Sequence, residues 1–185
     1  MDLCDLNTIK ALLGRHGFHF SKSMGQNFLI EDWVPRGLVE GAGVGPRNGV
    51  LEIGPGIGPL TAPHAAAAHH VVAVELDRSL LPVLDETLHD FSNVEVLPAD
   101  ILKLDIPALV DEKFTGLIPM ACANLPYNIT TPVLTALIEA ERFACIAVMI
   151  QREVALRICA APGTADYGAF SVYCQYHTQP ELLFD

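Results

Sequence analysis

The sequence predicts an α/β protein with a mostly parallel, doubly wound sheet, helices on both faces and an antiparallel hairpin at one edge. Apolar runs with the length and branching of buried strands alternate with helical segments. A glycine-rich turn, Gly54 to Gly58, follows the first such run. After Cys159 the alternation stops, and two strand-like runs follow each other closely. A chain of 185 residues that is 51% hydrophobic most simply makes one domain.

The first 48 residues predict two helices and a loop within the same catalytic domain, and residues 49–185 predict its core. A short helix is expected to be capped by Asn7, with its apolar side chains on one face. A loop from Phe18 to Ile30 leads to Asp32, which is expected to cap a second helix that runs to about Glu40.

The core is expected to contain five parallel strands joined by right-handed crossovers. The predicted strands are Gly49–Ile53, Val71–Glu75, Val94–Pro98, Leu117–Ala123 and Ala144–Ile150. The predicted helices are Leu60–Ala68, Ser79–Leu88, Pro107–Glu112, Thr131–Glu141 and Arg152–Cys159. The hairpin at the edge is expected to pair Phe170–His177 with Glu181–Phe184.

Charge and composition narrow the possible partners. A net charge of −11 argues against a broad phosphate-binding face. Residues 6–30 contain no carboxylate, so Lys10, Arg15 and Lys22 are the best candidates for contact with RNA. Five scattered cysteines and seven histidines make no metal-ligand pattern, and no apolar run approaches the roughly 18 residues of a membrane span. We expect a soluble, cytoplasmic, metal-free protein.

Polar residues follow four consecutive predicted strands, where ligands bind in doubly wound sheets. Glu75 stands about twenty residues after the glycines, a spacing typical of a carboxylate that accepts hydrogen bonds from a ribose. Pro55 removes a backbone donor that a pyrophosphate would use. The carboxylates suit a cationic cofactor, which favours S-adenosylmethionine over a dinucleotide. The predicted cofactor contacts from this reasoning are Glu52, Gly54, Gly56, Glu75, Asp100 and Ile101.

The unit Asn124-Leu125-Pro126-Tyr127 predicts the acceptor side of the site. The amine of adenine is a poor nucleophile, and two acceptors aimed at its N–H bonds favour a pyramidal nitrogen. The Asn124 side chain supplies one acceptor. Pro126 holds Leu125 in an extended conformation, so the Leu125 carbonyl supplies the other. Tyr127 is expected to stack on the base. These four residues are the predicted catalytic residues.

Motifs along nearly the whole chain resemble the ribosomal RNA adenine N6-dimethyltransferases, which have a Rossmann-like class I methyltransferase fold. The matching segments are KSMGQNFL at 22–29, EIGPGIG at 52–58, ELD at 75–77, DIL at 100–102, NLPYNIT at 124–130, QREV at 151–154 and YGAFSV at 167–172. The resemblance is strongest to the bacterial small-subunit branch whose loss gives kasugamycin resistance. It implies that Asn27, Leu29 and Asn124 also contact the cofactor.

The resemblance implies dimethylation of two adjacent adenosines in a hairpin loop near the 3′ end of small-subunit rRNA, by a monomer that acts in ribosome biogenesis. The family's small C-terminal helical domain has no counterpart before residue 185, so we expect this chain to bind the cofactor but to methylate ribosomal particles poorly. Two alternatives stay open. One is a large-subunit rRNA methyltransferase of the macrolide-resistance type, and the other is a non-catalytic ribosome-assembly factor on the same fold.

Overall fold

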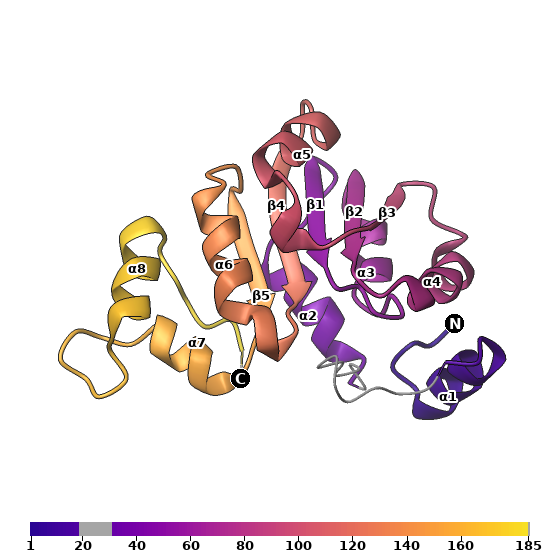
Figure 1. The fold of residues 1–185 in the computed structure, drawn as a ribbon, viewed down its shortest axis with the longest axis horizontal. Coiled ribbons are helices and arrows are strands. Elements are labelled where there is room, and N and C mark those ends of the chain that lie inside the picture. The colour runs from indigo at the N-terminus through magenta and orange to yellow at the C-terminus, as the bar shows by residue number, and fades with distance from the viewer. Residues whose placement is uncertain (19–30, 185) are drawn as a thin grey trace.

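The computed structural model describes residues 1–18 and 31–184. Its centre is a five-stranded sheet in the order β3-β2-β1-β4-β5, in which every neighbouring pair is parallel (Figure 1). The strands are β1 (Asn48–Ile53), β2 (His70–Glu75), β3 (Val94–Pro98), β4 (Ile118–Asn124) and β5 (Cys145–Met149). The predicted doubly wound α/β class is therefore confirmed, and each predicted strand agrees with the observed one to within a residue at either end.

Of the described helices, two precede the first strand, four lie between successive strands as predicted, and two follow the last strand. They are α1 (Leu6–Arg15), α2 (Trp33–Gly41), α3 (Thr61–Ala67), α4 (Leu81–Leu88), α5 (Ile106–Lys113), α6 (Thr130–Glu139), α7 (Arg152–Ile158) and α8 (Ala169–His177). Short 3₁₀ turns are η2 (Arg78–Leu80), η3 (Ile101–Lys103) and η4 (Tyr127–Ile129). The cap of α1 is Asp5 rather than the predicted Asn7, because the Asp5 carboxylate accepts the Thr8 N–H at 2.8 Å.

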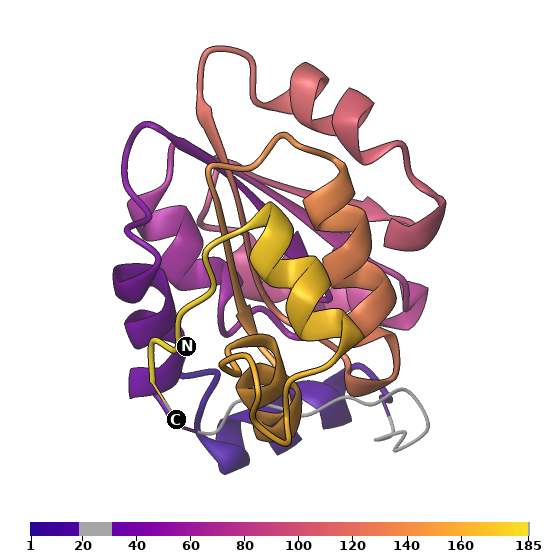
Figure 2. The same ribbon diagram turned by 90° about the vertical axis from the view of Figure 1, so that its left-hand side faces the viewer.

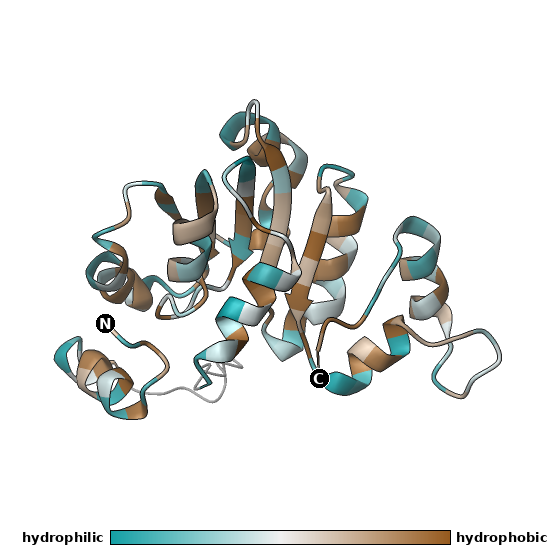
Figure 3. Ribbon diagram, turned by 180° about the vertical axis from the view of Figure 1, so that it is seen from behind, coloured by the Kyte–Doolittle hydropathy of each residue, from teal (hydrophilic) through white to brown (hydrophobic). Residues whose placement is uncertain are grey.

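Helices cover both faces of the sheet, and Figure 2 shows the resulting three layers. Successive strand residues point to opposite faces, so Leu51 and Ile53 join a core with α5 and α6, whereas Val50 joins one with α2 and α3. The strands are apolar along almost their whole length, and the hydrophilic residues gather on the outer helices and turns (Figure 3). Burial on both faces explains why the inner strands β1, β2 and β4 read as continuous apolar runs, whereas the edge strands β3 and β5 are only partly buried.

The predicted antiparallel hairpin was wrong, because its first half forms α8. Apolar and aromatic residues recur there at three- and four-residue spacing, which is the period of a helix. Two polar side chains lock α8 to the end of α7. The Ser171 hydroxyl donates to the Arg157 carbonyl at 2.5 Å, and the Gln175 amide donates to the Ile158 and Ala160 carbonyls at 2.9 and 2.8 Å.

The second half of the predicted hairpin, residues 181–184, is extended but belongs to no described sheet. It packs on α2 instead. The Phe184 ring meets the Trp33 ring edge-on at a centroid distance of 5.4 Å. A Cβ atom on Gly41 would lie 3.2 Å from Leu183 Cδ1, so the small glycine makes room for this segment.

The order of the strands places one crevice at the centre of the sheet. The chain runs from β1 outward to β3 and then returns to the other side of β1 with β4. In such sheets ligands bind beyond the carboxyl ends of the strands where the order reverses. The segments that follow β1 and β4 therefore meet at the expected site.

Candidate functional site

The glycine turn after β1 adopts a backbone shape that favours glycine at three positions. Gly54, Gly56 and Gly58 have φ angles of +67°, +62° and +95°. The Gly54 N–H donates to the Val74 carbonyl at 2.9 Å, which ties the turn to β2, and the Gly58 N–H donates to the Pro55 carbonyl at 2.9 Å. A Cβ atom on Gly56 would meet nothing within 4 Å, so this part of the turn faces open space.

Glu75, the last residue of β2, lies against this turn. One of its carboxylate oxygens accepts the Gly56 N–H at 3.2 Å, and the other accepts the Asp77 N–H at 2.8 Å. Burial raises the pKa of Glu75 above its ordinary value, although these two backbone donors act in the opposite direction. The structure thus brings together two of the predicted cofactor residues and leaves a desolvated acceptor beside the glycines.

The predicted acceptor unit lies directly beside the glycine turn, because β1 and β4 are neighbours. A Cβ atom on Gly54 would lie 3.7 Å from Pro126 Cγ, which is ordinary contact distance. Asn124 ends β4, and the buried Leu125 donates its N–H to the Met149 carbonyl at 3.0 Å. Pro126 is extended, with φ −58° and ψ 133°, and Tyr127 is 45% exposed. An exposed aromatic ring at this edge can receive a planar ligand.

Asp100 and Ile101 follow β3 at the same edge of the sheet. Asp100 caps η3 by accepting the Leu102 N–H at 3.1 Å, and its side chain keeps 29% of its surface exposed. Lys103 approaches the same carboxylate at 3.5 Å. Ile101 is buried in the core beneath. An adenine contact by these two residues stays a prediction, and their position after β3 is compatible with it.

Glu52 takes a place that its sequence position did not reveal. Its side chain is almost fully buried, and its carboxylate lies 3.2 Å from Nδ1 of His64 in α3, which is itself buried. A hydrogen bond between these two atoms requires a proton between them. Glu52 is thus tied to α3 through His64, and its predicted contact with a cofactor stays a prediction. No sequence pattern pairs a strand residue with a histidine twelve positions later.

The candidate RNA-contacting residues have different surroundings. Lys10 is exposed on α1. Arg15 is engaged with Glu86 of α4, and that carboxylate also lies 2.6 Å from Nε2 of His16. The hydrogen bonds from the His16 imidazole and then from the Arg15 guanidinium lower the pKa of Glu86. Three further predicted residues, Lys22, Asn27 and Leu29, lie outside the described residues.

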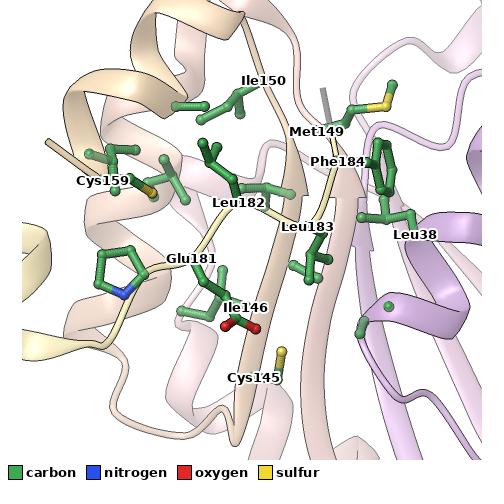
Figure 4. A pocket seen from close by; sticks show the side chains of 18 of the residues that line it. Leu38, Cys145, Ile146, Met149, Ile150, Cys159, Glu181, Leu182, Leu183 and Phe184 are labelled. Carbon is green, nitrogen blue, oxygen red and sulfur yellow. The ribbon is translucent and has the colours of Figure 1, made fainter.

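An apolar groove of about 890 Å³ runs along β5 and reaches Asn124 and Tyr127 at one end. Figure 4 shows Leu182 and Leu183 beside Ile146 and Met149, with Phe184 facing Leu38 of α2. The described residues that line it include none of the glycines of the turn. Among the described residues, the groove borders the acceptor unit at Asn124 and Tyr127, and Asn124 is the one predicted cofactor residue that lines it.

The described part of the chain holds no group of three or more His, Cys, Asp or Glu side chains placed to bind a metal ion. No described helix is long and apolar enough to cross a bilayer. The predicted site residues at this edge of the sheet carry carboxylates, a side-chain amide and backbone carbonyls. They form an acceptor-rich site, suited to hydroxyl and amine donors or to a positive charge.

The doubly wound sheet, with its glycine turn, Glu75 and acceptor unit at one crevice, defines a Rossmann-like methyltransferase fold. Residues 17–185 match the family described as "Ribosomal RNA adenine dimethylase". The chain belongs to that family.

Two relatives and two solved structures illustrate the similarity. "Ribosomal RNA small subunit methyltransferase A" of Alkaliphilus metalliredigens is 48% identical over 175 residues, which cover 94% of this chain and 61% of the relative. The protein of the same name from Bacillus cytotoxicus is 45% identical over 185 residues, which cover 98% of this chain and 63% of the relative. The chain thus spans less than two thirds of the length of these curated relatives. The solved 23S rRNA methyltransferase ErmE superimposes with a TM-score of 0.66 at 30% identity, covering 80% of this chain and 55% of that one. A dimethyladenosine transferase from Plasmodium falciparum superimposes with a TM-score of 0.65 at 26% sequence identity, covering 77% of this chain and 50% of that one.

Proposed function

We propose that this chain binds S-adenosylmethionine and carries out N6,N6-dimethylation of two adjacent adenosines near the 3′ end of small-subunit rRNA. The observation that carries the proposal is the proximity of the glycine turn to the acceptor unit, since a Cβ atom on Gly54 would lie 3.7 Å from Pro126 Cγ. This proximity supports the proposal that the glycine turn holds the cofactor while Asn124 and Leu125 accept hydrogen bonds from an adenine amine. Membership of the family and the names of the small-subunit relatives support the choice of substrate.

The residues present fit the cofactor. When bound, it supplies an electrophilic methyl group on a sulfonium. The buried Glu75 carboxylate accepts hydrogen bonds from the backbone N–H groups of Gly56 and Asp77, and in the proposed complex it accepts hydrogen bonds from the ribose hydroxyls in their place. Asp100 offers a partly exposed acceptor for the adenine amine of the cofactor. The open space at Gly56 leaves room for the ligand's approach.

On the acceptor side, the residues orient the target amine and hold the base. The Asn124 side-chain oxygen and the Leu125 carbonyl accept hydrogen bonds from the two N–H groups of the target adenine amine, and this arrangement turns the lone pair of that nitrogen outward. The extended backbone of Pro126 maintains this arrangement. Tyr127 stacks on the base and keeps it at the distance that an in-line transfer needs.

Labelled methyl transfer tests the proposal. Unmethylated small subunits, mature large subunits and DNA are each incubated with the chain and labelled cofactor, and the modified base is mapped. We expect label in adjacent adenosines of the small subunit, at a low rate, because this chain is expected to methylate ribosomal particles poorly. The likeness to ErmE makes the large subunit the second candidate, and label confined to it would replace the proposed substrate. Asn124→Ala is the matched control, since a non-catalytic assembly factor would keep all its activities in this variant.

We further infer that the protein acts as a monomer, without a metal, in the cytoplasm where rRNA is assembled into ribosomes. Light scattering of the purified chain should give the mass of one copy. Methyl transfer should be unchanged by EDTA. A stable dimer or loss of transfer with EDTA would overturn the corresponding statement.

A further inference from the structure

One residue of the glycine turn, Ile57, carries a large side chain into the interior. It stands between Gly56 and Gly58 and is fully buried. Its neighbours form a small apolar core, here called the turn cluster, made of Leu3, Ile9, Leu12, Leu13, Ile57, Leu80 and Val83. The turn cluster is separate from the two cores that pack on the faces of the sheet. Its members come from the N-terminal segment, α1, η2, α4 and the turn itself.

The turn cluster is also where α1 attaches to the rest of the domain. Ile9, Leu12 and Leu13 are the buried residues of α1, and all three belong to it. Arg15 and His16, at the end of α1, add their contacts with Glu86 of α4. Figure 1 shows α1 next to α4, on the side of the molecule to which the strands point. The same apolar contacts therefore dock α1 and hold the turn.

A turn with three glycines at positive φ loses much conformational freedom when it becomes ordered. Backbone hydrogen bonds at Gly54 and Gly58 restrain the two ends of the turn. Ile57 restrains its middle, because its side chain cannot leave the turn cluster without exposing apolar surface to water. Because these contacts already hold the turn in one conformation, a ligand that binds it causes little further loss of conformational entropy.

We propose that Ile57 is a positioning residue for the cofactor turn, and that α1 holds the turn in its binding conformation through Ile57. This inference rests on the proposed function for the identity of the ligand. Because coupling between two sites is reciprocal, cofactor binding must also stabilise the docking of α1. The buried face of α1 thus acts on cofactor affinity without touching the cofactor.

Calorimetric titration of purified variants with S-adenosylmethionine tests the proposal. Ile57→Ala is expected to raise the Kd about tenfold, within the usual range of coupling between sites, and Leu12→Ala to raise it by a smaller factor. The double variant should show less than the product of the two factors, because both remove the same restraint. Ile57→Val keeps the branched shape and should retain most of the affinity. The matched control is Val110→Ala, which shortens a buried side chain of α5 in another core.

A second readout separates positioning from general stability. Hydrogen exchange of the α1 amides should slow when S-adenosylmethionine binds the wild-type chain, and much less in Ile57→Ala. Circular dichroism verifies that each variant is folded at the temperature used, and if Ile57→Ala does not fold, Leu12→Ala carries the comparison. Equal affinity of wild type and folded Ile57→Ala (or Leu12→Ala in its place), or equal weakening by Val110→Ala, overturns the inference alone. Failure of the wild type to bind overturns the proposed function and this inference with it.

Discussion

Replacing Gly49 by alanine is expected to destabilise the protein, although alanine is ordinarily the better residue inside a strand. Gly49 is the second residue of β1, the strand that leads to the glycine turn, and it pairs with His70 of β2 and Pro119 of β4. The Phe114 ring lies directly over its Cα atom. A Cβ atom built there would lie 2.2, 2.4 and 2.9 Å from Cδ1, Cγ and Cε1 of that ring.

The size of the effect follows from how far the ring must move. Carbon atoms in contact settle near 3.5 Å, so the Phe114 ring must shift by about 1.3 Å. The ring is buried in the core and meets the His70 ring edge-on at 6.1 Å, so it has little room. Overpacking of this kind costs about 3 kcal/mol at its upper end. Removing a strand glycine returns about 0.5–1 kcal/mol. The cost of the clash exceeds the gain from removing the glycine, so we expect the free energy of unfolding to fall by about 2 kcal/mol.

Urea unfolding and thermal melting measure this loss. For a chain of this size, about 2 kcal/mol corresponds to a melting temperature lower by roughly 4–8 °C. The control is Gly14→Ala in α1, where a Cβ atom meets nothing within 4 Å and a gain of about 0.5–1 kcal/mol is expected. Phe114→Leu should reduce the penalty of Gly49→Ala in a double-mutant cycle. A Gly49→Ala variant as stable as wild type, or a penalty unchanged by Phe114→Leu, would refute the reasoning.

Four further predictions concern the site and its surroundings. Because burial raises the pKa of Glu75, the ionised form that accepts hydrogen bonds prevails above that pKa and is lost as the pH falls through it. As the pH is lowered, the affinity for the cofactor should therefore begin to fall at a higher pH than it would with an ordinary glutamate. The Glu75→Gln variant should bind the cofactor weakly, with an affinity that does not change with pH. A wild-type affinity that does not change with pH would contradict this. Asn124→Ala should lower the rate of methyl transfer by about 10²–10³ while cofactor affinity falls much less, and Tyr127→Phe should keep the RNA affinity that Tyr127→Ala loses. Comparable losses in both Tyr127 variants would exclude stacking. His64→Leu leaves the buried Glu52 without its partner and should cost about 3–5 kcal/mol in urea unfolding, more than the double variant Glu52→Leu/His64→Leu; additive losses would show that the pair does not act as a unit.

Much of the fold could be predicted because strands and helices are written in short stretches of sequence. The predicted strand Val94–Pro98 has the bounds of β3. The failure at Phe170–His177 has the same origin, since aromatic and branched residues favour a strand while their spacing favours a helix. The helix is favoured over the strand there by Ser171 and Gln175, whose side chains donate hydrogen bonds to carbonyls at the end of α7. Those partners lie 14 to 17 residues away and cannot be read locally.

The predicted site shows the same division. The chain alone determined the glycine turn, the strand-end acids and the acceptor unit, because each depends on backbone preferences within a few consecutive residues and on the rule that parallel strands end at one edge. Only the tertiary structure decided that Glu52 pairs with His64 and that Ile57 anchors α1. These contacts depend on which side chains meet when separate helices pack on the sheet and on the turn. Close packing admits few such arrangements, and no short stretch of sequence specifies them.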